Sequence, residues 1–264
     1  MVPTIQPAVA AMFDGVRIAC QTRSGDRRHP SSRGVVRGTI RSVRIAMIHP
    51  ATSAASVVRR LGSWAAWSML GIGCGYAVAL TLGFVRYGLS APITDPLLAI
   101  MEVLTMLSAP LIVVLMATLR EDTAPERRIF STLSFGFAVA FATLTSSVHF
   151  VELTALRQLG RAQLIWPSVT YAVELLAWDG FLGLSLLSAA ATIRATSASQ
   201  SSRWDTALRR SLLLAGVLCV AGLIGPALGQ MRWQFVGVFG YAVVLPVVCY
   251  VFARRFSDAP RCKQ

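Results

Sequence analysis

The chain has 264 residues, of which 55% are hydrophobic and only 14% are charged. Soluble domains carry nearer to roughly a quarter charged residues, so the composition excludes an ordinary soluble domain and indicates a protein of the lipid bilayer. The net charge of +13 could suggest a nucleic-acid partner. However, the basic residues lie between and outside the apolar runs without any nucleic-acid motif, so we expect no nucleic acid and instead anionic head groups of the cytoplasmic leaflet.

Residues 1–58 differ in composition from the rest of the chain. They hold eight arginines against only Asp14 and Asp26, with proline, serine and glycine scattered among them and no sustained period. This composition predicts a disordered basic N-terminal arm. Two alternatives stay open: arginine-rich, acid-poor segments are typical of organelle transit peptides, and translation could start at Met47.

The next segment, residues 59–255, predicts a transmembrane domain, followed by a cytoplasmic tail at 256–264. It contains six apolar runs, each long enough to cross about 30 Å of hydrocarbon as a helix. The fold class is therefore all-α, a polytopic transmembrane bundle of six helices. We expect Asp95 to cap the second helix and a capping box, Thr123-x-x-Glu126, to begin the third. The predicted helices are 62–85, 96–119, 127–152, 167–193, 208–229 and 234–253.

Lysine and arginine are distributed unequally between the two sides of this bundle. The side that holds both termini carries 21 of them, and the other side carries 4. The positive-inside rule then predicts that the N-terminus and the C-terminus are both cytoplasmic. The chain has 24 arginines but one lysine and no asparagine, a usage typical of a GC-rich bacterial genome. The expected location is the bacterial cell inner membrane, as a multi-pass protein.

Small residues mark expected contacts between helices. Gly71, Gly73 and Gly75 lie along the first predicted helix, and a G-x-x-x-G spacing, Gly225-Pro-Ala-Leu-Gly229, ends the fifth. Such residues let helices approach closely. The contacts could form within the bundle or between copies in a homo-oligomer, and both interpretations stay open.

A short pattern, Y-A-V-x-L, begins at Tyr76, Tyr171 and Tyr241. An inverted repeat of three helices would pair the first helix with the fourth, as in some transporters. Tyr76 is expected deep in its helix and Tyr171 near the outer end of its own, which argues against such a repeat. Coincidence in a chain rich in alanine, valine and leucine is the simpler interpretation.

Five ionisable side chains fall inside the predicted helices. A charged residue at the bilayer centre costs roughly 2.5–3.5 kcal/mol, so such groups are usually turned inward, paired or protonated. All but the last are expected in the outer third of the bilayer, on helices adjacent in sequence, which short loops make neighbours in space. The five are Glu102, His149, Glu152, Glu174 and Asp179.

The fourth helix carries two of these carboxylates in the run YAVELLAWDG. Tyr171, Glu174 and Trp178 share one helical face, whereas Asp179 lies about 140° around the helix from Glu174 and should face a different neighbour. His149 is one candidate partner for Glu174. Arginines of the following loop, at 157 and 161, are others, and Glu152 could pair with the first of them.

These residues lead to three hypotheses about function. The first is an outward-facing pocket of helices two to four that binds or carries a proton, a cation or a small polar solute; histidine and buried carboxylates serve such roles. The second is a structural or partner-binding membrane protein in which the same groups fasten helices. The third and least favoured is an intramembrane metal-dependent hydrolase. We assign no catalytic residue and no particular metal or cofactor. The expected ligand-binding residues are Glu174, His149, Glu102, Glu152, Asp179 and Tyr171.

Three segments also carry a resemblance to other proteins. They are His149-Phe-Val-Glu152-Leu-Thr154, YAVELLAWD at 171–179, and Gly225-Pro-Ala-Leu-Gly229. With them, residues 60–255 resemble small six-helix integral membrane proteins of GC-rich bacteria that carry a domain-of-unknown-function label. The resemblance implies a six-helix fold and lends no activity or catalytic residue.

Overall fold

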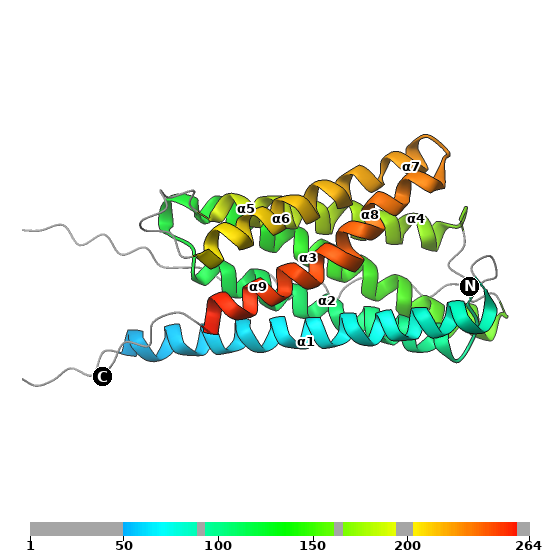
Figure 1. Cartoon of the computed structure of the whole chain (residues 1–264), viewed down its shortest axis with the longest axis horizontal. Helices are drawn as coiled ribbons and strands as arrows, with labels where there is room; N and C mark the ends of the chain where they lie inside the picture. Colours follow the sequence, from blue (N-terminus) through cyan, green and yellow to red (C-terminus); the bar gives the residue numbers. More distant parts are fainter. Residues whose placement is uncertain (1–49, 89–92, 161–165, 194–202, 258–264) are drawn as a thin grey trace, which may run out of the picture. The chain divides into compact units, whose positions relative to one another are not determined.

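The computed structural model describes residues 50–88, 93–160, 166–193 and 203–257. Within these ranges the chain forms helices and short turns and no β-strand. Six helical segments are long and apolar enough to cross a membrane, which confirms the predicted all-α bundle (Figure 1). In chain order they consist of α1 (Pro50–Tyr87); α2 (Leu97–Glu121); α3 (Arg128–Val151) with η3 (Glu152–Leu156); α4 (Val169–Leu175), η4 (Leu176–Leu182) and α5 (Gly183–Thr192); α6 (Arg203–Gly222) with α7 (Ile224–Ala227); and η5 (Met231–Gln234), α8 (Phe235–Phe239), η6 (Gly240–Val244) and α9 (Leu245–Ser257).

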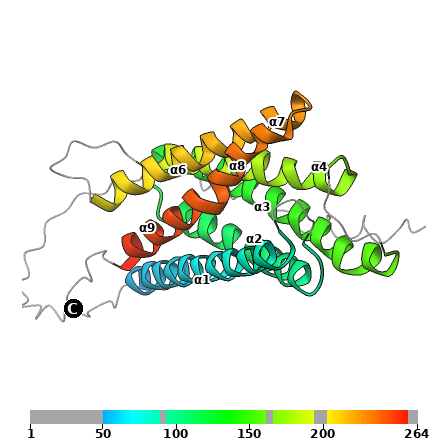
Figure 2. The same ribbon diagram turned by 45° about the vertical axis from the view of Figure 1, so that its right-hand side comes forward.

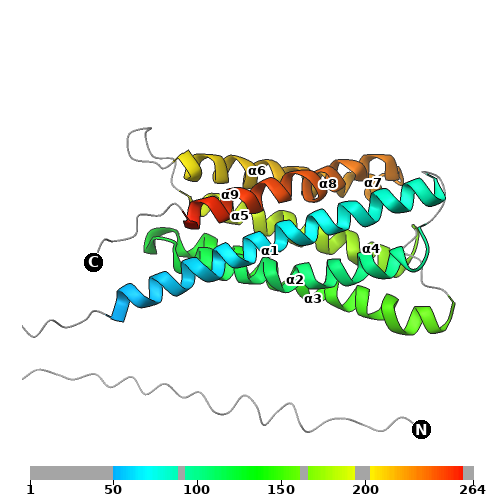
Figure 3. The same ribbon diagram turned by 60° about the horizontal axis from the view of Figure 1, so that its bottom comes forward.

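The helices pack in the order in which the chain makes them. α1 contacts α2, α2 contacts α3, and α3 contacts η4 and α5. α5 in turn contacts α6, α6 contacts α9, and α9 returns to α1. Figures 1 and 3 show α1 beside both α2 and α9, and Figure 2 shows these neighbours from another side. The second, third and fourth membrane helices are therefore neighbours, as predicted.

The distribution of side chains is that of a protein surrounded by lipid. Large apolar residues such as Val85, Val169 and Phe235 are exposed on the helix surfaces. The interior holds an aromatic and aliphatic core but also buried Glu102, Glu152 and other polar groups. Large exposed apolar surfaces mark membrane contact, and polar groups in membrane helices turn towards the bundle interior.

The helix ends differ from the prediction in several places. α1 begins at Pro50, ahead of the predicted start at residue 62, so the arm predicted for 1–58 is too long. The first part of α1, before residue 62, precedes the apolar run, so hydrophobicity alone does not reveal that it is helical. The rest of that arm, including Met47, and the tail beyond residue 257 lie outside the described residues.

The expected capping box of the third helix is wrong. The hydroxyl of Thr123 donates to the carbonyl of Leu119 at the end of α2, where unpaired carbonyls need donors. A 3₁₀ turn, η2 (Pro125–Arg127), then leads into α3. At the second helix, α2 begins at Leu97 without a side-chain cap from Pro96, although Asp95 Oδ1 accepts the N–H of Ala99 at 3.2 Å.

The predicted glycines differ in how closely other helices approach them. A Cβ added to Gly225 would lie 2.6 Å from the backbone nitrogen of Gln234, which confirms a close contact there, whereas nothing lies within 4 Å of a Cβ at Gly229. No atom lies within 4 Å of the position a Cβ would occupy at Gly71, and Gly73 and Gly75 meet only ordinary van der Waals contacts. A further close pair, which was not predicted, is Gly183 on α5 and Gly216 on α6, where an added Cβ would lie 3.2 Å and 3.0 Å from the opposite glycine's carbonyl oxygen. Small residues at this contact bring the two backbones together.

Three membrane helices contain a π-helical turn: η3, η4 and η6. Such turns are rare and occur frequently at functional sites. Glu152 lies in η3, Asp179 in η4 and Tyr241 in η6. For η6 a cause lies nearby, because Pro246 has no N–H to donate to the preceding turn. Each π-turn therefore places one polar side chain in the bundle interior or beside it.

Candidate functional site

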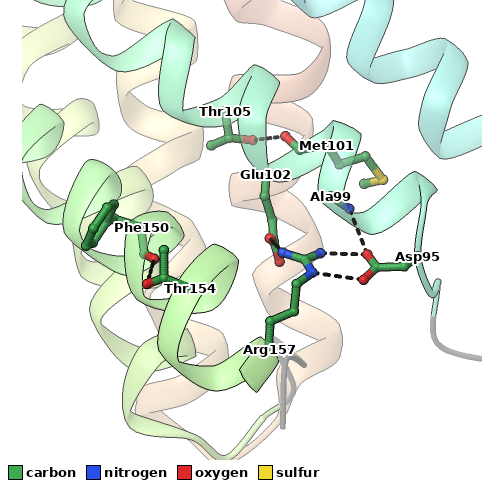
Figure 4. Close-up of polar contacts among 8 residues, drawn as sticks. All are labelled: Asp95, Ala99, Met101, Glu102, Thr105, Phe150, Thr154 and Arg157. Carbon is green, nitrogen blue, oxygen red and sulfur yellow. Dashed lines mark hydrogen bonds and ion pairs between the residues drawn. The ribbon is translucent and has the colours of Figure 1, made fainter. Parts of the chain in front are cut away.

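The site begins with an ion-pair bridge at the start of α2. Arg157 contacts Asp95 through two hydrogen bonds, 2.6 Å from Nη2 to Oδ1 and 2.8 Å from Nε to Oδ2. Its Nη1 donates to Glu102 Oε2 at 3.0 Å (Figure 4). The Asp95 side chain is 52% exposed and that of Glu102 only 2%. Arg157 thus joins an acid in the loop to an acid inside the bundle.

Electrostatic effects at this bridge follow from the contact. The Arg157 guanidinium holds the pKa of the Asp95 carboxyl below its usual value of 3.8. The hydrogen bond to Asp95 in turn raises the pKa of Arg157 above its usual range, so Arg157 stays charged. The pairings expected for Arg157, with Glu174 or Glu152, are therefore wrong: the side chain reaches across to the start of α2. Arg161 lies outside the described residues.

The backbone near Arg157 is shaped by local hydrogen bonds. Thr154, within η3, donates from its hydroxyl to the carbonyl of Phe150 at 2.6 Å, as Figure 4 shows. On the facing helix, Thr105 donates in the same way to Met101 at 2.9 Å. Bonds of this type compete with the regular helix pattern and often bend helices. At η3 the helix departs from α geometry just where Glu152 enters the interior.

A second contact joins α3 to the fourth membrane helix. His149 Nε2 lies 2.9 Å from Glu174 Oε1, and both side chains are largely buried. Trp178 Nε1 donates to the same Glu174 oxygen. This confirms that Glu174 and Trp178 share a helical face and that His149 is a partner of Glu174. Within the described residues, His149 Nδ1 and Glu174 Oε2 have no hydrogen-bond partner.

Glu152 lies between His149 and Arg157 in the sequence and carries a fully buried carboxyl group. Its side chain is 0% exposed, and neither carboxyl oxygen has a hydrogen-bond partner among the described residues. Glu102 is within electrostatic range of both Glu152 and His149. The ion-pair bridge, Glu152 and the His149–Glu174 pair therefore form one group, which we name the Arg157 cluster. Its members are Asp95, Glu102, His149, Glu152, Arg157 and Glu174.

The remaining two predicted site residues lie beside the cluster. Asp179 faces Gly222 on α6 and Gly237 on α8, which confirms the expectation that it faces a different neighbour from Glu174. Tyr171 is within electrostatic range of both carboxylates, and its ring packs edge-on against Trp166.

Two polar residues near Asp179 were not predicted as site residues. Gln234 is 4% exposed, faces Asp179, and donates from Nε2 to Tyr241 Oη at 3.2 Å. Neither Asp179 oxygen makes a hydrogen bond of regular geometry. The sequence gives little indication that either residue belongs to a site. Gln234 is one polar residue at the start of an apolar run, and Tyr241 belongs to the Y-A-V-x-L pattern, which was interpreted as coincidence.

The hollow that the structure shows does not lie at the outward-facing pocket expected between helices two to four. A hollow of about 270 Å³ lies on α1, lined by Ala77, Val78, Thr81 and Leu82, and no candidate residue borders it. Among the described residues, no three His, Cys, Asp or Glu side chains are placed to hold a metal ion. Arg157 already occupies the side of Glu102 where a cation would bind. The Arg157 cluster is thus a packed polar group.

Comparison of the chain with protein-family models, with curated proteins and with solved structures found no significant match. The resemblance to six-helix proteins of GC-rich bacteria stays a prediction.

Proposed function

We propose that the chain is a multi-pass protein of a bacterial inner membrane, with cytoplasmic termini, that binds protons in the Arg157 cluster as a proton-coupled carrier does. The observation that carries the proposal is a charge imbalance. Asp95 and Glu102 contact Arg157, Glu174 contacts His149, and Glu102 is in electrostatic range of His149 and Glu152. Four carboxyl groups are thus connected to only one arginine and one histidine. Fully ionised, the cluster would hold two uncompensated negative charges.

Burial makes that imbalance costly. Three of the four carboxyl groups belong to membrane helices, and Glu152 makes no hydrogen bond in the described part of the chain. An unpaired charge in hydrocarbon costs roughly 2.5–3.5 kcal/mol on insertion scales. Uptake of protons removes this cost without any change in packing. Chains of acidic residues and histidine inside membrane helices are the usual elements of proton relays.

A proton fits the packing better than a larger ligand does. Glu102, His149 and Glu152 are each less than one-tenth exposed and pack against their neighbours. A metal ion or a polar solute needs a space and several converging ligands, whereas a proton needs only an oxygen or nitrogen lone pair. The geometry therefore supports a proton better than a metal ion or a polar solute.

The alternative function, fastening of helices, is favoured by one observation. Arg157 joins the loop before α2 to the end of η3 through a bidentate contact. A purely structural role would make the whole cluster a set of fixed hydrogen bonds. It would give no net uptake of protons when the protein folds, and this difference separates the two functions.

Thermal unfolding of the detergent-purified protein from about pH 5 to about pH 8 tests the proposal, since histidine and perturbed carboxyls titrate in this range. A folded state that binds extra protons loses stability as the pH rises, by about 1.4 kcal/mol per pH unit for each proton. Glu174→Gln should weaken this slope. The matched control is Glu126→Gln, an exposed position in η2.

Two results would contradict the proposal. An equal slope in wild type and Glu174→Gln, with the variant merely melting earlier, would indicate a fastener. Stabilisation of wild type by a divalent cation, absent in Glu174→Gln, would indicate a cation site; a ligand at 100 times its Kd adds about 2.7 kcal/mol.

The predicted orientation has its own test. Thr123 lies between α2 and α3, and Gln230 lies between α7 and η5. In a cysteine-free background, Thr123→Cys should react with a membrane-impermeant thiol reagent only from the cytoplasmic side, and Gln230→Cys only from the outside. The reverse pattern would overturn the orientation.

A further inference from the structure

Asp179 is a second buried carboxyl group, held at a place where three membrane helices meet. It lies in η4, is 0% exposed, and has no hydrogen bond of regular geometry to either oxygen in the described part of the chain. Buried polar side chains are nearly always paired. An unpaired carboxyl at such a position calls for a functional explanation.

The surroundings of Asp179 are shaped to receive its carboxyl group. A Cβ added to Gly222 on α6 would lie 2.8 Å from Asp179 Oδ2, and one added to Gly237 on α8 would overlap Oδ1. Glycine at both positions therefore makes room for the carboxyl group between the two helices. A Cβ at Gly225 would likewise lie 2.6 Å from the backbone nitrogen of Gln234. Three glycines thus fit the chain around Asp179 and Gln234.

No positive charge faces this carboxyl group among the described residues. The titratable groups within electrostatic range are Tyr171 on its own helix, Cys219 on α6 and Tyr241 in η6. Gln234 is the other polar side chain facing it. A carboxylate without a cation in hydrocarbon is unfavourable, so the site requires a bound cation, of which the proton is the smallest.

The packing selects the proton over an alkali ion. Gly222 and Gly237 approach both carboxyl oxygens closely. The Gln234 amide nitrogen is a hydrogen-bond donor, which cannot coordinate a cation, and it donates to Tyr241. An alkali ion needs several oxygen atoms around it and space between them. A proton needs only one lone pair of Asp179.

A continuous series of contacts joins this group to the Arg157 cluster. Glu174 accepts the hydrogen bond from Trp178, and the Trp178 ring packs against Tyr241 with centroids 5.0 Å apart. Tyr241 accepts from Gln234, which faces Asp179. Tyr171 lies within electrostatic range of both carboxyl groups, and a phenol hydroxyl both donates and accepts hydrogen bonds.

We propose that Asp179, enclosed by Gly222, Gly237 and Gln234, is a second proton-binding site, deeper in the membrane than the Arg157 cluster. Binding forms one O–H bond on the carboxylate, and release returns the proton to water or to Glu174, with no redox change. The site itself stands on its own geometry; its role as the next station of a proton path rests on the proposed function.

Unfolding curves of Asp179→Asn, Glu174→Gln and the double variant, measured across pH, test this site. A proton held only in the folded state changes the folding equilibrium about tenfold per pH unit. Asparagine has the shape of the neutral acid, so Asp179→Asn should fold. It should lose the one-proton slope relative to wild type, and the double variant should lose the same slope relative to Glu174→Gln. If Glu174→Gln keeps the wild-type slope while Asp179→Asn loses it, the proposed function fails and the Asp179 site stands.

A second measurement does not depend on a variant's folding. A hydrophobic carbodiimide reacts with protonated carboxyl groups in apolar surroundings, and mass spectrometry locates the adduct. Wild type should be labelled at Asp179, less so as the pH rises, with sodium and potassium ions giving no protection. The site would be overturned if Asp179→Asn kept the wild-type slope and Asp179 of the wild type were not labelled. It would also be overturned if sodium ions stabilised wild type but not Asp179→Asn.

Discussion

His149 Nε2 and Glu174 Oε1 lie 2.9 Å apart, which joins α3 to the fourth membrane helix inside the bundle. The same carboxyl oxygen accepts the indole N–H of Trp178, so one oxygen serves two donors while the other has no partner in the described chain. This contact links the Arg157 cluster to the aromatic residues around Tyr241. It is the point at which a change in protonation would be felt on both sides.

The energetic coupling between His149 and Glu174 can be measured directly. Directly contacting pairs show coupling free energies of about 0.5–3 kcal/mol in double-mutant cycles. We expect a value in this range from His149→Ala, Glu174→Gln and the double variant. Unfolding free energies provide the measurement; additive effects would show that the two groups do not interact.

Glu152 should reduce the stability of the folded protein. Replacing it with methionine, a side chain of similar length, removes a buried carboxyl group that has no hydrogen-bond partner in the described residues. Because an unsatisfied buried polar group costs about 1–3 kcal/mol, Glu152→Met should raise the unfolding free energy by a similar amount. Glu126→Met, at an exposed position, is the control. A strongly destabilised Glu152→Met protein would mean that the carboxyl group is paired after all.

The glycine beside Asp179 should tolerate no side chain. Gly237→Ala places a methyl group on the Asp179 carboxyl, and overpacking of this kind costs about 1–3 kcal/mol. Gly71→Ala is the matched control, because no atom lies within 4 Å of its Cβ position and alanine favours a helix over glycine by about 1 kcal/mol. Equal melting temperatures for the two variants would show that Gly237 is not tightly packed.

The Arg157–Asp95 contact predicts a pH effect on the acid side. Arg157 holds the pKa of Asp95 below 3.8 in the folded protein, whereas the unfolded value is ordinary. The contact therefore stabilises the fold at neutral pH, and this stabilisation is lost as the pH falls through the lower, folded pKa. Asp95→Asn should melt earlier than wild type at neutral pH, with a difference that disappears in acid. A difference independent of pH would indicate loss of packing alone.

Much of the fold was predictable because it depends on length and composition. Six apolar runs of sufficient length, with short connections, leave few arrangements other than a bundle of neighbouring helices. Counting along the helices also placed Glu102, His149, Glu152 and Glu174 at the same end. The contact of His149 with Glu174 follows from that depth and from the adjacency of their helices.

The details of the site could not be predicted in this way. The reach of Arg157 to Asp95 and Glu102 depends on how α2 and η3 rotate about their axes, which no local pattern encodes. π-turns such as η4 have no clear sequence signal, and η4 changes which neighbours Asp179 meets. The glycines around Asp179 come from two separate helices, so only the tertiary contact reveals that Gly222 and Gly237 belong together.

Infrared difference spectroscopy of the carboxyl groups tests the central claim most directly. A protonated carboxyl group has a C=O band that a carboxylate lacks, so the spectrum reports bound protons without requiring a transported substrate. Proton binding by the Arg157 cluster predicts such a band in wild type and in Glu126→Gln at neutral pH, its decline as the pH rises, and a loss of part of it when the carboxyl groups of the cluster are replaced by amides. A wild-type spectrum with no protonated carboxyl band at neutral pH would contradict proton binding by the Arg157 cluster.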